Sequence, residues 1–308
     1  MTAQIIDGRK IAARLCEDVA AELGAAVVDG VPVGLATVLV GGDPAARAYL
    51  RRLDRTAAAL GVFRRSVTLP GSAPVADVVA AVRELNRDPA VSGILVLRPL
   101  PPGIDEAAVF AALDPCKDVE AVHPENAGLL ALGTPRYIPS TAAAVFHVLD
   151  SWLDETGQER AGFYHRARIV VVGRSNNVGK PAVSLAFAKQ AAITSVDEWA
   201  SVGNQLGAYT RRADVLIVAA GVPQLIRAEH VRAGAVVIDV GINLVEHPGE
   251  RTPRIVGDVA LDEVTGRARA VTPVPGGVGP VTDIWLVRNT VLAARNAAVA
   301  PGGDRRAS

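Results

Sequence analysis

Short apolar runs alternate with segments of helical periodicity along this chain, and the alternation occurs in two separate blocks. Runs that are apolar at every position are typical of strands buried on both faces, and such strands alternate with helices in mostly parallel sheets. In the first block, helices are predicted at 9–24, 45–60 and 73–86, and strands at 33–40, 62–69 and 92–97. In the second block, strands are predicted at 168–172, 192–196, 214–219 and 234–240, and helices at 179–190 and 204–212. The sequence therefore predicts an α/β protein of two domains.

The remaining segments are predicted as connections and a last helix. Residues 140–155 have helical periodicity, and we interpret them as a bridge between the two domains. The polar, glycine-containing segment 155–166 is predicted to be a surface loop. Residues 283–298 are predicted as the final helix, and the Gly/Arg-rich tail from Pro301 is predicted to be disordered.

Composition excludes several classes of function. The 308 residues carry no net charge, which argues against a nucleic-acid surface or an electrostatic membrane binder. The apolar runs are too short to span a bilayer, and the N-terminus lacks the basic and apolar regions of a signal peptide. Cys16 and Cys116 lie far from each other and from any histidine cluster. We therefore expect a cytoplasmic protein with reduced cysteines and without a metal site, a nucleic-acid partner or a membrane partner.

A glycine-bearing turn follows the predicted strand 168–172. A strand that leads through such a turn into a helix presents free backbone N–H groups to a phosphate. Gly173 permits the tight turn and Gly179 permits close approach, but Ser175 replaces the usual middle glycine and Gly179 comes one residue late. Taken alone, the turn fits either a dinucleotide-binding loop or an ordinary strand-to-helix connection.

The end of the next predicted strand carries an acid, Asp197, 24 residues after Gly173. An acid there can accept a hydrogen bond from an adenosine ribose 2′-hydroxyl and would repel a 2′-phosphate. The alternative is a solvated acid that caps a loop. Arg174, beside the phosphate loop, favours a 2′-phosphate instead.

Three further features are candidates for a site. The segment 272–280 contains three prolines and three glycines, and such a side-chain-poor loop lets the backbone approach a planar ligand. The segment 115–120 contains two acids, Asp118 and Glu120, and a lysine, which also fits a charged surface turn. Tyr49 lies on a predicted helix, where a lone tyrosine is usually a packing residue.

The order of these features resembles the bifunctional methylenetetrahydrofolate dehydrogenase/methenyltetrahydrofolate cyclohydrolase (FolD-like) family over nearly the whole chain. The matching pieces are Asp43-Pro44-Ala45 with Tyr49, Pro99-Leu100-Pro101, Lys117-Asp118-Val119 with His123-Pro124, Gly173-Arg174-Ser175 with Val178-Gly179, Asp239-Val240-Gly241-Ile242-Asn243, Gly257-Asp258-Val259 and the segment 272–280.

The resemblance implies a folate-binding catalytic domain at 1–142, a Rossmann-like NAD(P)-binding domain at 143–279, and a C-terminal helix at 280–300 that packs on the first domain. It also implies a homodimer and hydride transfer from methylenetetrahydrofolate to a nicotinamide. The predicted cofactor-binding residues are Gly173, Arg174, Ser175, Val178, Gly179, Asp197 and Ile242, of which Gly173, Arg174, Ser175 and Ile242 match the family's cofactor contacts. The predicted substrate-binding residues are Tyr49, Leu53, Leu97, Glu120, Pro275, Gly276 and Gly277, of which Tyr49 and the loop 275–277 match the family's folate-side residues. Tyr49 and Glu120 are expected to act in catalysis.

Departures from the family pattern bear on the second half of its chemistry. Leu53 replaces the family's lysine one turn after the tyrosine, and Leu97 replaces the glutamine that supports that lysine. Cyclohydrolysis must move protons, which leucine cannot do, whereas hydride transfer needs mainly correct positioning. Glu120 replaces the family's aspartate. The other departures are Ser140 for a cysteine, and Asp283 and Trp285 at positions that are usually small or aliphatic.

The segment Ser195-Val196-Asp197 also departs from the family's His-Ser-x-Thr stretch, which suits NADP. It is more similar to monofunctional NAD-dependent members. We therefore predict a methylenetetrahydrofolate dehydrogenase that uses NAD, with NADP as the alternative, and that has lost cyclohydrolase activity. Three other hypotheses stay open: a bifunctional enzyme with another proton carrier, a family member with a different substrate, and a non-catalytic binding protein.

Overall fold

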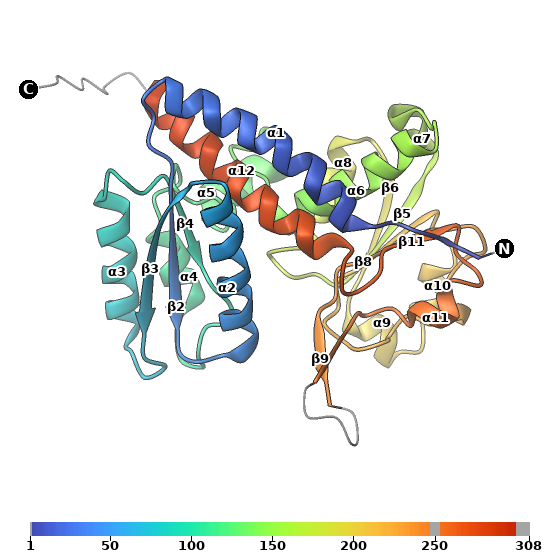
Figure 1. The fold of residues 1–308 in the computed structure, drawn as a ribbon. Helices are drawn as coiled ribbons and strands as arrows, with labels where there is room; N and C mark the ends of the chain where they lie inside the picture. The colour runs from blue at the N-terminus through green and yellow to red at the C-terminus, as the bar shows by residue number, and fades with distance from the viewer. Residues whose placement is uncertain (1, 247–252, 300–308) are drawn as a thin grey trace, which may run out of the picture. The chain divides into compact units, whose positions relative to one another are not determined.

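The computed structural model describes residues 2–246 and 253–299 (Figure 1). The chain divides into two compact units, each built from two separate segments. Unit 1 comprises residues 1–14 and 141–282, and unit 2 comprises residues 15–140 and 283–308. The divisions fall inside three continuous helices, which are α1 (Gly8–Val28), α6 (Ser140–Glu155) and α12 (Val278–Val299).

Unit 2 contains a parallel three-stranded sheet in the order β3-β2-β4. Its strands are β2 (Gly34–Val40), β3 (Phe63–Leu69) and β4 (Gly93–Val96). Its helices are α2 (Pro44–Ala59), α3 (Val75–Arg87), α4 (Glu106–Ala111) and α5 (Pro124–Ala131), with α2 and α3 on opposite sides of the sheet (Figure 1). The central strand β2 is buried at every position, as its uninterrupted apolar sequence predicts.

Unit 1 contains a parallel six-stranded sheet in the order β1-β11-β8-β7-β5-β6. Its strands are β1 (Gln4–Ile5), β5 (Arg168–Val172), β6 (Ala192–Val196), β7 (Val215–Val218), β8 (Val236–Asp239) and β11 (Ala270–Val271). Its other helices are α7 (Arg160–Arg166), α8 (Gly179–Ala188), α9 (Glu198–Val202), α10 (Leu206–Thr210), the 3-10 helix η1 (Ala228–His230) and α11 (Leu261–Val264). A separate antiparallel pair is formed by β9 (Asn243–Val245) and β10 (Arg254–Val256).

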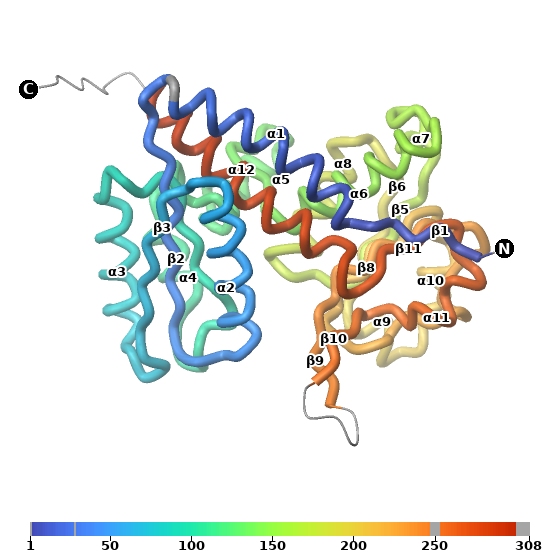
Figure 2. Tube along the Cα trace, in the orientation of Figure 1, coloured from blue at the N-terminus to red at the C-terminus, as the bar shows by residue number. Residues whose placement is uncertain are grey.

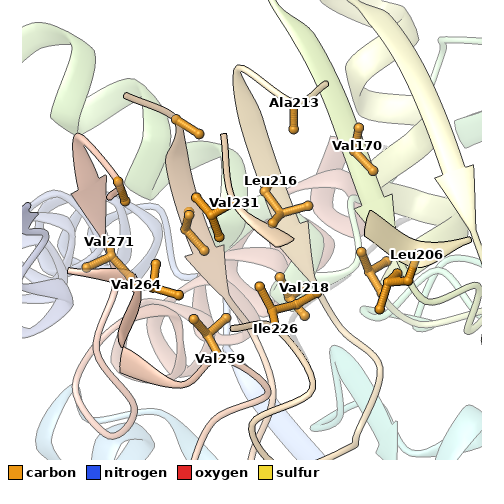
Figure 3. Packing of buried hydrophobic residues seen from close by; sticks show 14 of the residues in the cluster. Val170, Leu206, Ala213, Leu216, Val218, Ile226, Val231, Val259, Val264 and Val271 are labelled. Carbon is orange, nitrogen blue, oxygen red and sulfur yellow. The ribbon is translucent and has the colours of Figure 1, made fainter. Parts of the chain in front are cut away.

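The core of unit 1 packs apolar side chains of the central strands against those of the short helices and loops (Figure 3). Leu216 and Val218 of β7 lie in one cluster with Leu206 of α10 and Val264 of α11. This burial holds the carboxyl ends of β5, β7 and β8 in register, and ligands of open parallel sheets bind at such ends.

Most predicted strands and helices are confirmed within a few residues, but three of them differ. The segment predicted as a loop at 155–166 contains α7, because the Glu159 carboxylate accepts hydrogen bonds from the N–H groups of Ala161 and Gly162. The predicted helix at 204–212 is shorter, and α9 precedes it. The last helix begins at Val278 rather than 283. The prediction for the tail from Pro301 lies outside the described residues.

The predicted folate-binding domain, 1–142, includes the N-terminal segment, whereas in the structure residues 1–14 belong to unit 1. Gln4 and Ile5 pair with Ala270 and Val271, so β1 extends the sheet of unit 1 (Figure 2). The Trp152 indole donates a hydrogen bond of 2.9 Å to the Gln4 side chain, which fastens the same segment to α6. No helix in the described part of the chain is long and apolar enough to cross a membrane.

Candidate functional site

The turn between β5 and α8 has the geometry that its glycines predict. Gly173 has a φ of +107°, and a Cβ there would lie 2.1 Å from the Ala219 carbonyl oxygen. A Cβ on Gly179 would lie 2.1 Å from the Gly173 carbonyl oxygen. The Ser175 hydroxyl accepts from the N–H groups of Val178 (3.3 Å) and Gly179 (3.4 Å). The backbone thus wraps tightly at the start of α8 and forms a cradle that suits a phosphate.

Arg174 and Asp197, which favour opposite cofactors, are paired with each other. The Arg174 Nη1 lies 2.7 Å from the Asp197 carboxylate, and its Nε and Nη2 donate to the hydroxyl and carbonyl oxygens of Ser195. The other Asp197 oxygen accepts from the N–H of Trp199 and caps α9. Asp197 is therefore both the cap of α9 and a charged neighbour of the turn between β5 and α8.

Two buried carboxylates fix the loops that follow β7 and β8. Asp258 accepts hydrogen bonds from the N–H groups of Ala220 (2.6 Å) and Gly221 (2.8 Å) and from the Asn243 side chain (2.8 Å). Asp239 accepts from the backbone N–H groups of residues 241, 258 and 259. Burial raises the pKa of Asp239 to about 7, although these hydrogen bonds lower it.

This carboxylate pair orders the loop that carries Ile242, whose side chain is exposed. Sequence reasoning gave Asp239 and Asp258 no role of their own. The available signal was that each acid lies beside a glycine, Gly241 and Gly257. A Cβ on either glycine would meet an acid side chain at about 2 Å, so the glycines make room for the pair.

The Pro/Gly-rich loop lies in unit 1 and is held close to the start of α1. A Cβ on Gly8 would lie 1.7 Å from the Gly277 carbonyl oxygen. Gly276 has a φ of +106°, and a Cβ there would lie 3.3 Å from the Arg9 Nε. The loop thus packs closely against the Gly8 backbone and the Arg9 side chain, and its glycines leave the space that this packing needs.

The remaining predicted site residues lie in unit 2. Tyr49 and Leu53 lie one turn apart on α2, and Leu97 follows β4. Leu53 is completely buried and Leu97 is 2% exposed, whereas Tyr49 is partly exposed. Burial raises the pKa of Tyr49 well above its usual value, and the negative charges of Glu120 and Asp283 raise it further.

The charged residues of the segment 115–120 differ in how many hydrogen bonds they make to their surroundings. Lys117 donates to the carbonyl oxygen of Asp88 at 2.8 Å. The fully buried Asp118 accepts from the N–H groups of Val122 and His123 and from the Asn126 side chain. These two residues are therefore occupied in holding the loop.

Glu120 differs, because the one hydrogen bond that the structure describes for it comes from the Ser140 N–H at 3.3 Å. Burial raises the pKa of Glu120 to about 7, assisted by the charge of Asp118 and opposed by hydrogen bonding from Ser140 and by the charge of Arg98. Its carboxylate keeps acceptor capacity for a ligand.

Comparison with known proteins connects both halves of the chain to one family. The catalytic-domain model of the tetrahydrofolate dehydrogenase/cyclohydrolase family matches residues 6–120, and the NAD(P)-binding-domain model matches residues 139–298. Bifunctional protein FolD 2 of Rubrobacter xylanophilus is 56% identical over 310 residues, which cover 100% of this chain and 97% of that protein. The chain belongs to this family.

Other members support the same assignment. Bifunctional protein FolD of Acidiphilium cryptum is 46% identical over 96% of this chain and 99% of its own. The crystal structure of the Trypanosoma brucei methylenetetrahydrofolate dehydrogenase-cyclohydrolase, complexed with NADP and an inhibitor, has a TM-score of 0.88. It is 34% identical and covers 97% of this chain and 100% of that chain. The predicted family and the predicted two-domain α/β fold with a Rossmann-like domain are thereby confirmed.

The roles of individual residues stay predictions. In unit 1 the structure brings together Gly173, Arg174, Ser175, Val178, Gly179 and Asp197 around one turn. In unit 2, Tyr49 and Glu120 are close enough for the charge of Glu120 to act on the Tyr49 hydroxyl. Sequence reasoning did not foresee that Asp283 pairs with Arg52.

Proposed function

We propose that this protein is a 5,10-methylenetetrahydrofolate dehydrogenase that prefers NAD and does not hydrolyse its methenyl product above background. One observation carries the proposal. Tyr49 and Glu120 share one polar environment, while Leu53 and Leu97, at the positions of the family's lysine and glutamine, are buried apolar side chains.

The folate side of the reaction is assigned to unit 2. The Glu120 carboxylate accepts hydrogen bonds from the amino and ring N–H groups of the pterin, and the Tyr49 ring orients the substrate. The C–H bond of the one-carbon bridge then breaks with its electron pair, and the bridge carbon becomes part of a cationic amidinium. This step needs near-attack geometry and no proton carrier in the protein.

The cofactor side is assigned to unit 1. The tight turn at Gly173 and Gly179 fits a dinucleotide phosphate, and the family places Ser175 and Ile242 among the cofactor contacts. Asp197 would accept a hydrogen bond from the ribose 2′-hydroxyl and repel a 2′-phosphate. When bound, NAD supplies the hydride acceptor.

The absence of cyclohydrolysis follows from the same residues. Hydrolysis of the methenyl group requires activation of water and movement of protons, to which general acid–base assistance contributes about 10²–10⁴ in rate. The aliphatic side chains of Leu53 and Leu97 have no group that can accept or donate a proton. Their replacement as a pair leaves no buried polar partner unsatisfied.

A bifunctional enzyme is the second candidate, and a specific observation favours it. Burial raises the pKa of Glu120 to about 7, which is where a proton carrier works best near neutral pH. The 56% identical relative is named a bifunctional protein. If Glu120 shuttles the proton, the substitution at position 53 does not abolish hydrolysis.

One assay separates the two candidates. The protein is mixed with methylenetetrahydrofolate and either NAD or NADP, and the absorbance of methenyltetrahydrofolate is followed. We expect faster turnover with NAD and accumulation of the methenyl product, which a bifunctional relative added later should clear. Direct conversion to formyltetrahydrofolate supports the bifunctional candidate, and lack of turnover with either cofactor contradicts both.

We also propose that the protein is a homodimer, as the family resemblance implies. Unit 1 ends its sheet at β6, whose outer edge pairs with no other strand in the described part of the chain. Sedimentation equilibrium at micromolar concentration tests this proposal, and a mass near that of a single chain would contradict it.

A further inference from the structure

A salt bridge connects α2 to the C-terminal helix beside Tyr49. The Arg52 Nε lies 2.5 Å from one Asp283 oxygen and its Nη2 lies 3.1 Å from the other. The Asp283 side chain is only 5% exposed and the Arg52 side chain is 41% exposed. Two parallel hydrogen bonds of this kind fix the plane of the guanidinium as well as its position.

The fixed guanidinium also covers Tyr49. Its central carbon lies 5.3 Å from the centroid of the Tyr49 ring, which is within the range of cation–π attraction. Arg52 and Tyr49 are three residues apart on α2 and therefore lie on neighbouring parts of the helix surface. The contact restrains the ring on the side toward α12.

The charges of the pair act on Tyr49 in opposite directions. The negative charge of Asp283 raises the pKa of the Tyr49 hydroxyl, and the positive charge of Arg52 lowers it. Burial raises the pKa of the Asp283 carboxyl, while the hydrogen bonds and the charge of Arg52 lower it. An ionised Asp283 beside a guanidinium that stays protonated at any working pH makes a pair without net charge. It can therefore orient the tyrosine without adding a net charge to the site.

We propose that Asp283 and Arg52 form a charge-neutral positioning pair for Tyr49, in which Asp283 holds the guanidinium against the ring and cancels its charge. The inference rests on the proposed dehydrogenase function. As hydride leaves, positive charge develops on the folate bridge, and an uncompensated cation nearby would oppose it. The neutral pair allows Tyr49 to be held without that repulsion.

The first test removes only the compensating charge. Asp283→Asn keeps the shape of the side chain and leaves Arg52 as an unpaired cation. With methylenetetrahydrofolate and NAD, we expect kcat to fall about tenfold, because the cation opposes the transition state. The deuterium isotope effect on kcat, measured with substrate labelled at the bridge, should rise as hydride transfer becomes slower.

The second test removes both charges. In the variant Arg52→Met with Asp283→Leu, kcat should return to within about threefold of the unmodified enzyme, while KM for the folate rises because Tyr49 is no longer held. Replacement of an ion pair by apolar side chains is often neutral for folding, so this variant stays informative if Asp283→Asn fails to fold. A collapse of kcat in the double variant would overturn the proposal.

A matched salt bridge on the same helix serves as the control. Arg288 of α12 pairs with Glu22 of α1 through its Nε (3.3 Å) and Nη2 (2.5 Å). Glu22→Gln should leave kcat and its isotope effect unchanged. A merely structural role for Asp283 predicts that Asp283→Asn behaves in the same way, with a lower melting temperature and an unchanged isotope effect, and this result overturns the proposal.

The unmodified enzyme is assayed first, which separates failure of this inference from failure of the proposed function. An unmodified enzyme without dehydrogenase turnover overturns both. An active enzyme whose Asp283→Asn variant keeps its kcat overturns the charge-neutral pair alone.

Discussion

Glu120 and Asp118 are two residues apart, yet their surroundings give them different roles. Asp118 accepts three hydrogen bonds, two from the backbone of its own loop and one from the Asn126 side chain of α5, so its capacity as an acceptor is largely used. The structure describes one hydrogen bond to Glu120, from the Ser140 N–H at the start of α6, and burial raises the pKa of Glu120 to about 7. The difference means that Glu120, rather than Asp118, keeps acceptor capacity for the ligand that we propose.

The raised pKa of Glu120 predicts how folate binding depends on pH. Pterin N–H groups donate to the ionised carboxylate, so binding favours the deprotonated form and affinity should rise as pH rises through about 7. Tetrahydrofolate should bind about tenfold more weakly at pH 6 than at pH 8 by calorimetry. Glu120→Gln should remove this step, and NAD binding serves as the control. A flat profile for the unmodified protein between pH 6 and 8 would contradict the assignment.

The pairing of Arg174 with Asp197 predicts a preference for NAD. While Asp197 accepts from Arg174, the guanidinium is not free to hold a 2′-phosphate, and the carboxylate repels that group. Asp197→Asn is the sharpest variant, because its side-chain oxygen can still cap α9. The ratio of kcat/KM for NAD to that for NADP should fall about tenfold in this variant. Higher efficiency with NADP in the unmodified enzyme would refute the preference.

On helix α2, the i to i+4 spacing places Tyr49 and Leu53 on one face, although only Leu53 is completely buried. We predict that the double variant Leu53→Lys with Leu97→Gln gains cyclohydrolase activity, because the new lysine can then move protons and the new glutamine gives it a polar partner. Leu53→Lys alone should gain less cyclohydrolase activity, since apolar surroundings lower the pKa of a lysine or favour a rotamer that points to solvent. The measurement is the rate of decay of added methenyltetrahydrofolate, with each single variant as the control. Rapid decay with the unmodified protein would show that residue 53 is not decisive.

The elements differ in how well the sequence predicts them. Strand β7 is apolar at every position and β2 has Thr37 as its one polar residue, and this pattern predicts their burial directly. The two-residue strand β1 carries no such pattern, and its pairing with β11 depends on residues far away in the chain. Helix α7 was missed because its capping acid, Glu159, lies within a polar stretch that also fits a loop.

The candidate site was likewise predictable only where it depends on a local sequence pattern. Glycine spacing identifies the turn at Gly173 without any tertiary information. The contact between Arg52 and Asp283 joins residues 231 positions apart, which no local pattern reveals. The buried pair Asp239 and Asp258 likewise becomes recognisable only when the burial and the hydrogen bonds are known.

Each unit of the molecule is assembled from two segments of the chain, so each depends on a distant segment for part of its core. Unit 2 consists of residues 15–140 and the C-terminal segment from Asp283. The second segment supplies Leu286, Val287 and Val291, all at most 1% exposed. The Asn289 side chain also donates to the carbonyl oxygens of residues 119 and 138, both at 2.8 Å.

This arrangement predicts the effect of ending the chain after Thr282. Unit 2 would lose three buried side chains worth about 1.5–3 kcal/mol each, a sum comparable to the whole stability of a domain of about 5–15 kcal/mol. Unit 1 keeps both of its segments in the shortened chain. In hydrogen exchange, amides of β2 and β4 should therefore exchange rapidly, while those of β5, β7 and β8 stay protected. A chain that ends after Val299 is the control and should protect both sheets. Continued protection of β2 in the chain ending at Thr282 would mean that unit 2 does not need its C-terminal segment to fold.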